Sequence, residues 1–186
     1  MSLSNQNIEQ LIQQCSTGNQ NAQFEIYNRY YKAMYNTSYR IVKDQFIAED
    51  IMQDSFLTAF NKLKSLKERN TFGSWLKRIV INNSIQYYNK NSRYDEIPLD
   101  HVMCKVDDNI SIESDYEFTN LKAKQVLETM TALKDNYRVA LSLHLIEGYD
   151  YEEISNILNL SYANCRTTIS RAKESLRQKL IHLKVS

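Results

Sequence analysis

The sequence predicts an all-α protein made of two small helical domains joined by a flexible acidic linker. Residues that interrupt helices are rare, with only 3 glycines and 1 proline among 186 residues. Apolar side chains recur at three- and four-residue spacing through most of the chain, and no segment alternates as a strand does. The charges are also segregated, because the net charge is +4 over residues 1–90, −6 over 91–120 and +3 over 121–186. This pattern indicates two basic domains on either side of an acidic connection.

The first domain is expected over residues 1–90. Polar breaks at Ser16–Asn19 and Asp44–Gln45 divide its helical periodicity, which predicts helices over 7–15, 21–42, 46–66 and 71–89. The second of these helices has an expected apolar face of Phe24, Tyr27, Tyr31, Met34, Tyr35 and Tyr39. The third has an expected core face of Ile51, Met52, Phe56, Ala59, Phe60, Leu63 and Leu66.

The periodicity fails after the fourth helix. Residues 91–117 contain the proline, Pro98, and 8 acidic against 2 basic residues, so this segment is predicted to be a flexible linker. The second domain is expected over 118–186. Its predicted helices, the first of which begins just before the boundary, cover 115–133, 135–147, 151–158 and 162–182.

The last two predicted helices are typical of a helix-turn-helix. Asn159 tolerates the left-handed backbone of a tight turn, Leu160 is expected to fill the corner, and Ser161 is a good N-cap. The second helix has an apolar stripe at steps of four, three, four and four residues: Cys165, Ile169, Ala172, Leu176 and Leu180.

The opposite side of this helix has polar and cationic side chains that suit a DNA major groove. An ordinary helical hairpin would explain the stripe, but DNA binding also explains the turn, the cap and the exposed chemistry. The predicted DNA-contacting residues are Tyr162, Asn164, Arg166, Thr167, Ser170, Arg171 and Lys173.

One face of the helix over 46–66 indicates a protein interface. Its members lie at i, i+3, i+4, i+7 and i+11, and they place a leucine among acid and amide groups: Asp50, Gln53, Asp54, Leu57 and Asn61. An apolar anchor with a polar rim is typical of a docking surface. On this pattern alone, a solvated face with one stray leucine is an equal alternative.

A basic and aromatic segment follows this helix. Cations meet phosphates and aromatic rings can hold unstacked bases, so the segment suits melted DNA better than intact duplex. Its predicted DNA contacts are Lys62, Lys64, Lys67, Arg69, Asn70, Phe72, Lys77, Arg78 and Asn82. The alternative is that Phe72, Trp75, Leu76 and Ile79 are core, which their helical spacing favours for the last three.

Nothing in the sequence predicts catalysis or a cofactor. No nucleophile–base pair is evident, and His101 and Cys104 lack a second pair of ligands, so no metal site is expected. The cysteines at 15, 104 and 165 fit reduced thiols in the cytoplasm. No apolar run is long enough to span a membrane, and the polar N-terminus lacks a signal-peptide layout. A cytoplasmic protein without membrane insertion is expected.

Three segments of the chain, in the order in which they follow one another, resemble those of an extracytoplasmic-function (ECF) sigma factor, a promoter-specificity subunit of bacterial RNA polymerase. Residues Ala48–Leu57 resemble the helix with which the family docks on polymerase. Residues Phe72–Asn82 resemble its −10 recognition segment. Residues 133–180 resemble its helix-turn-helix domain, which reads the −35 element. The two domains would thus be a σ2-like bundle and a σ4-like helix-turn-helix.

The resemblance implies a role for each segment. Asp50, Gln53, Asp54 and Leu57 would face the β′ coiled coil of core polymerase, which would also be contacted at its β flap. The loop from Lys64 to Asn70 would capture a flipped base of the non-template strand, and the helix of Arg166 would face the −35 duplex. The acidic linker would thread the polymerase. The resemblance leaves room for an anti-sigma factor and for an accessory DNA-bound protein that recruits the polymerase.

Two other functions are weighed against this one. A stand-alone helix-turn-helix regulator would bind duplex DNA without polymerase, but it needs neither the 46–66 docking face nor the 62–78 loop. An enzyme of nucleic acids would need clustered carboxylates or Cys/His ligands, which the sequence lacks.

The recognition helix also departs from the family pattern. Thr168 stands where an arginine is common, which predicts a relaxed or weak −35 preference.

Overall fold

The computed structural model describes residues 5–91 and 114–185, and every element in those ranges is a helix or a helical turn. This confirms the all-α prediction. The chain divides into two compact units, residues 1–92 and 93–186. The segment that carries Pro98, His101 and Cys104 lies outside the described residues.

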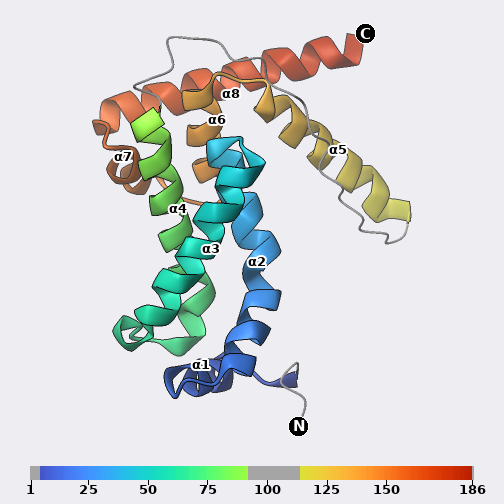
Figure 1. The fold of residues 1–186 in the computed structure, drawn as a ribbon. Helices are drawn as coiled ribbons and strands as arrows, with labels where there is room; N and C mark the ends of the chain where they lie inside the picture. The colour runs from blue at the N-terminus through green and yellow to red at the C-terminus, as the bar shows by residue number, and fades with distance from the viewer. Residues whose placement is uncertain (1–4, 92–113, 186) are drawn as a thin grey trace. The chain divides into compact units, whose positions relative to one another are not determined.

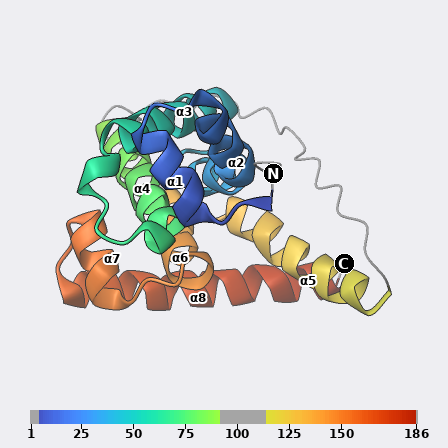
Figure 2. The same ribbon diagram turned by 90° about the horizontal axis from the view of Figure 1, so that it is seen from below.

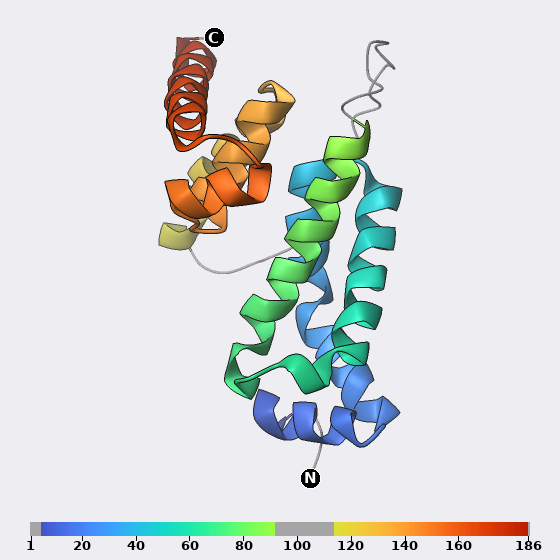
Figure 3. The ribbon, with the colours of Figure 1, turned by 90° about the vertical axis from the view of Figure 1, so that its left-hand side faces the viewer.

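The N-terminal unit is a bundle of three long helices closed at one end by a short one (Figures 1 and 3). Its elements are α1 (Ile8–Ser16), α2 (Gln20–Val42), α3 (Gln45–Asn61), two 3₁₀ turns, η2 (Leu63–Ser65) and η3 (Arg69–Thr71), and α4 (Phe72–Asn91). The helices α2, α3 and α4 all contact one another. The helix α1 contacts α2 and both turns, and Figure 3 shows it lying across the end of the bundle.

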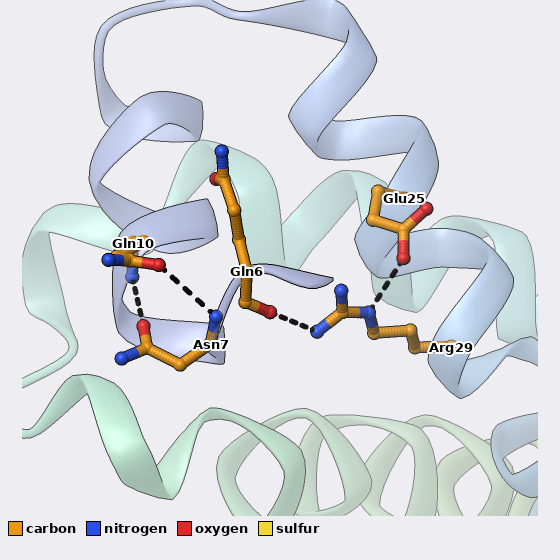
Figure 4. Close-up of polar contacts among 5 residues, drawn as sticks. All are labelled: Gln6, Asn7, Gln10, Glu25 and Arg29. Carbon is orange, nitrogen blue, oxygen red and sulfur yellow. Dashed lines mark hydrogen bonds and ion pairs between the residues drawn. The ribbon is translucent and has the colours of Figure 1, made fainter. Parts of the chain in front are cut away.

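Polar side chains fix where these helices begin. Asn7 and Gln10 form a reciprocal capping box at α1, and the Asn7 carboxamide oxygen accepts from the Gln10 N–H at 2.9 Å (Figure 4). Asn19 caps α2 and Asp44 caps α3 by accepting from the backbone N–H of Ala22 and of Ile47, respectively. Arg29 of α2 donates to the Gln6 carbonyl at 2.9 Å, so it ties the entry of α1 to the bundle (Figure 4).

The expected apolar face of α2 is partly wrong. Phe24 is 66% exposed, whereas Ile26, which was not among the predicted positions, is fully buried. The buried stripe starts at Ala22 and continues through Ile26 and Met34 to Ile41. Phe24 lies about 200° around the helix from Ala22, because each residue turns the chain by about 100°, so its ring points away from the core.

The helix predicted over 46–66 ends early, at Asn61. The chain continues as the turn η2, in which the Ser65 hydroxyl donates to the Lys62 carbonyl at 2.7 Å. Leu63 is nevertheless buried, because the tighter turn keeps it on the core side. The apolar periodicity therefore continues beyond the end of the α-helix, into η2.

The C-terminal unit is built on one long helix, α8 (Tyr162–Val185), as Figure 2 shows. It contacts α5 (Ser114–Thr131), α6 (Asp135–Leu141) and α7 (Tyr151–Leu158). The helix predicted over 135–147 changes to a π-helical turn, η4, over Ser142–Ile146. Gly148 follows with φ of 79°, a left-handed value that suits glycine and lets the chain turn into α7.

The helix-turn-helix corner between α7 and α8 has the predicted backbone. Asn159 is left-handed, with φ of 53° and ψ of 46°, and the Ser161 hydroxyl accepts from the Asn164 N–H at 3.3 Å. The prediction that Leu160 fills the corner is wrong, since its side chain is 38% exposed. Its backbone N–H closes the corner instead by donating to the Ser155 carbonyl at 2.9 Å, a Schellman arrangement.

Candidate functional surfaces

The predicted docking residues all lie exposed on α3. The helix buries Ala48, Met52, Phe56 and Ala59 and presents its opposite side to solvent. The exposed side has two carboxylates, two amides and a leucine that is 62% exposed: Asp50, Gln53, Asp54, Leu57 and Asn61. We call these five residues the α3 face. It has no cation, and its one apolar group is large enough to anchor a partner.

A groove continues the α3 face onto α4. Its volume is about 490 Å³, and Asp54, Leu57 and Asn61 line one side of it. The other side is formed by α4, from Asn83 to Lys90. The Asn83 amide donates to the Ser55 hydroxyl at 3.0 Å and so bonds the two helices to each other. Asn83 is therefore engaged within the unit, while its neighbour Asn82 is exposed.

The loop between α3 and α4 exposes a cluster of cations. Its two 3₁₀ turns are closed by hydroxyls, since Ser65 donates to the Lys62 carbonyl and Thr71 to the Glu68 carbonyl, each at 2.7 Å. The exposed predicted contacts on this loop are Lys62, Lys64, Lys67, Arg69 and Asn70. On α4, Arg78 and Asn82 are exposed and Lys77 is half-buried.

Phe72 does not belong to this surface. Its ring is 0% exposed and meets the Tyr30 ring edge-on, with centroids 5.7 Å apart. A base could not reach it without opening the core, so the prediction of a direct DNA contact is wrong. Its position at the start of α4 places it among the core residues, and the half-buried Trp75 packs beside it at 6.0 Å.

The helix α8 presents six of its seven predicted DNA-contacting residues to solvent. Its buried side has Cys165, Ile169, Ala172 and Leu176, and Leu180 is half-buried, as the stripe predicted. The exposed side begins with Tyr162, which is 52% exposed, and includes two arginines: Tyr162, Asn164, Arg166, Thr167, Ser170 and Arg171. We call these six residues the α8 face. Thr168, where the family often has arginine, is half-buried.

The seventh predicted contact, Lys173, is half-buried and engaged inside the unit. Its ammonium lies 3.0 Å from His144 Nε2 and 5.9 Å from the centre of the Tyr151 ring. The sequence analysis missed His144 and Tyr151, since neither stands in a recognisable motif with Lys173. Only the three-dimensional packing of η4, α7 and α8 brings the three side chains together.

The described residues form no metal centre. Over residues 5–91 and 114–185 no three His, Cys, Asp or Glu side chains could hold a metal ion. Burial raises the pKa of the Cys15 thiol to about 11 and also raises the pKa of Cys165. Burial therefore disfavours the thiolate, which is the reactive form, at both positions. None of the described helices is long and apolar enough to cross a membrane.

Comparison with known families places two domains on the chain. Residues 26–94 match sigma-70 region 2, and residues 123–176 match sigma-70 region 4. The region 4 match lies within the second compact unit, and the region 2 match lies in the first unit except for its last two residues, 93 and 94.

Individual proteins match over most of their length. The ECF RNA polymerase sigma factor SigM of Bacillus subtilis is 29% identical over 154 residues, which cover 82% of this chain and 91% of SigM. SigW, an ECF RNA polymerase sigma factor of the same organism, is 29% identical over 189 residues, covering 93% of this chain and 96% of SigW. The solved structure of the sigma factor RpoE with the anti-sigma factor NepR from Bartonella quintana has a similar fold. Its TM-score is 0.57 at 19% identity, covering 84% of this chain and 94% of RpoE.

Proposed function

Because the chain belongs to the ECF sigma factors, we propose that it binds core RNA polymerase in the cytoplasm, directs the enzyme to specific promoters and helps to open the −10 region. It performs no catalysis of its own, since RNA synthesis belongs to the polymerase. The observation that carries this proposal is the coexistence, in one chain, of an anionic exposed face on α3 and a cationic exposed face on α8.

The N-terminal domain, residues 1–90, docks on polymerase through the α3 face. Asp50 and Asp54 attract a basic partner surface, and Leu57 enters an apolar pocket on that partner. The β′ coiled coil is the proposed partner of this face, and the β flap is a second contact on the core enzyme.

The loop between α3 and α4 holds the melted −10 strand. Lys62, Lys64, Lys67 and Arg69 neutralise phosphates, and their exposure on closed turns leaves their ammonium and guanidinium groups available. Asn70 and Asn82 can donate to and accept from a base edge. With Phe72 buried, the half-buried rings of Phe60 and Trp75 are the aromatic groups that flank this loop in the chain.

The C-terminal domain, residues 118–186, contacts the −35 duplex through the α8 face. The N-terminal turns of α8 enter the major groove, where Asn164, Arg166 and Arg171 can reach base edges or phosphates. The acidic segment 91–117 joins the two domains and threads through a basic channel of the polymerase. An anti-sigma factor, of the kind found with RpoE, could regulate the chain by covering the α3 face.

Runoff transcription with purified core polymerase on a promoter library tests this function. Promoter-specific transcripts are expected only when the chain is added. A chain that binds promoter duplex tightly without polymerase and yields no transcripts with it would be a stand-alone regulator, and the proposal would fail.

A further inference from the structure

His144 connects the recognition helix to the elements that precede it. Its Nδ1 lies 3.1 Å from the Tyr149 carbonyl oxygen, and its Nε2 lies 3.0 Å from the Lys173 ammonium. The imidazole also stacks on the Tyr151 ring, with centroids 5.0 Å apart and planes 24° from parallel. Three elements, η4, α7 and α8, therefore meet at one side chain.

The two polar neighbours determine the state of this imidazole. A carbonyl oxygen can only accept, so Nδ1 bears the proton and donates to Tyr149. An ammonium can only donate, so Nε2 is unprotonated and accepts from Lys173. A neutral His144 in one tautomer satisfies both partners, and the Tyr151 ring, 5.9 Å from the ammonium, adds a cation–π contact.

This arrangement adds a polar contact to the apolar packing that orients α8. Lys173 lies about two helical turns beyond Arg166, at the far end of the α8 face. A helix held at that point cannot rotate about its axis or slide without breaking the contacts of Lys173. The sequence placed Lys173 among the DNA contacts, but its ammonium is directed at His144 and Tyr151 inside the unit.

We propose that Lys173 is a positioning residue of the DNA-reading helix rather than a phosphate contact, and that His144 and Tyr151 hold it in place. This proposal rests on the proposed function only in that α8 must face DNA. It separates the three cations in the N-terminal half of α8 into two groups. Arg166 and Arg171 act on the nucleic acid, and Lys173 acts on the helix that presents them.

Salt-dependent promoter binding by the holoenzyme separates the two roles of Lys173. A phosphate contact contributes about 0.9 to the slope of log affinity against log salt concentration, whereas a positioning contact contributes nothing to it. We expect Lys173→Met to lower affinity by about two- to tenfold, the range that one hydrogen bond covers, with an unchanged slope. Lys179→Met, a change at an exposed lysine on the same helix, is the matched control and should leave affinity and slope unaltered.

A double-mutant cycle then tests the partnership. His144→Ala should also lower affinity, and the double variant should be no worse than the more damaging of the two single ones. His144→Gln retains an acceptor for the ammonium and should recover most of the loss, which also guards against a merely unfolded His144→Ala protein. Additive losses in the double variant, no recovery with glutamine, or a slope reduced by Lys173→Met would each overturn the proposal.

Arg166→Ala distinguishes failure of the proposed positioning role of Lys173 from failure of the proposed function of α8. If Arg166→Ala leaves promoter binding intact, then α8 does not face DNA and the proposed −35 role is wrong. If Arg166→Ala weakens binding and the His144 and Lys173 variants behave independently of each other, then only the positioning role is wrong.

Discussion

The α3 face and the α8 face are built in the same way and differ in chemistry. Each lies opposite a buried apolar stripe, with Met52 and Phe56 under one and Ile169 and Ala172 under the other. The α3 face has two carboxylates and an exposed leucine, but no cation. The α8 face has two arginines and no carboxylate.

This difference shows how one kind of scaffold supports two kinds of recognition. A protein interface gains from desolvating an apolar anchor inside a polar rim, which Leu57 and its neighbours provide. A DNA interface gains from neutralising phosphates and from donors that reach base edges, which Arg166, Arg171 and Asn164 provide. Helix geometry alone does not predict the class of partner. The charge of the exposed face and the presence of an apolar anchor determine whether the face suits a protein or DNA.

The largest expected effect comes from breaking the α3 face. Asp50→Lys combined with Leu57→Asp should abolish polymerase binding, because a reversed charge and a buried carboxylate at an interface centre cost about 2–5 kcal/mol. A pull-down with core polymerase measures the loss, and circular dichroism checks the fold. Phe24→Asp, at an exposed aromatic on α2 rather than on α3, is the matched control and should still bind. Undiminished binding by the double variant would refute the assignment.

The next effect concerns how sharply the α8 face reads sequence. Thr168 is half-buried and cannot make the bidentate guanine contact of an arginine, which is worth about 1–3 kcal/mol of discrimination. Transcription from promoters with a randomised −35 region should therefore recover only a weak preference, with and without candidate recruiting partners. A sharp consensus obtained with core polymerase alone, and lost on Arg166→Ala, would show that this helix reads sequence strongly.

A smaller effect is expected for DNA binding by the isolated protein. The net charge of −6 over residues 91–120 competes with phosphate for the basic domains. Full-length protein should therefore bind promoter duplex several-fold more weakly at low salt than residues 118–186 do, and the difference should shrink as salt is added. Fluorescence anisotropy with labelled duplex measures both affinities. Equal affinities at low salt would exclude this competition.

The smallest effect concerns the buried thiol of the N-terminal unit. Because the pKa of Cys15 is raised to about 11, the unfolded chain loses this proton near pH 9 while the folded chain still holds it. The contribution of this thiol to the free energy of unfolding is fully present below pH 9. It is lost as the pH rises towards 11, by at most about 1.4 kcal/mol per pH unit. Urea unfolding of the wild type and of Cys15→Ala measures it. Identical pH slopes for the two proteins would show that this thiol does not contribute.

The local parts of the fold were predictable from sequence because they depend on neighbouring residues. The left-handed Asn159, the cap at Ser161 and the stripe from Cys165 to Leu176 follow from local stereochemistry and periodicity. Phe24 and Phe72 were misplaced for a different reason. A ring beside polar residues looks the same in sequence whether it faces solvent, as Phe24 does, or the Tyr30 ring, as Phe72 does.

The parts that sequence could not supply depend on distant contacts. Lys173 and His144 are 29 residues apart, so no spacing rule connects them. The bond from Asn83 to Ser55 joins α4 to α3 across 28 residues, and only that contact shows that Asn83 is engaged while Asn82 is exposed. Composition and periodicity thus identified both faces, and tertiary structure corrected which residues belong to them.

Photo-crosslinking in the promoter open complex tests the contrast between the two faces most directly. A photoreactive amino acid placed at position 57 should crosslink to a polymerase subunit, and the same amino acid at position 166 should crosslink to promoter DNA around −35. Position 24, exposed on α2 and not on α3, is the control and should give neither product. Crosslinks from position 57 to DNA, or from position 166 only to protein, would contradict the division of labour between α3 and α8.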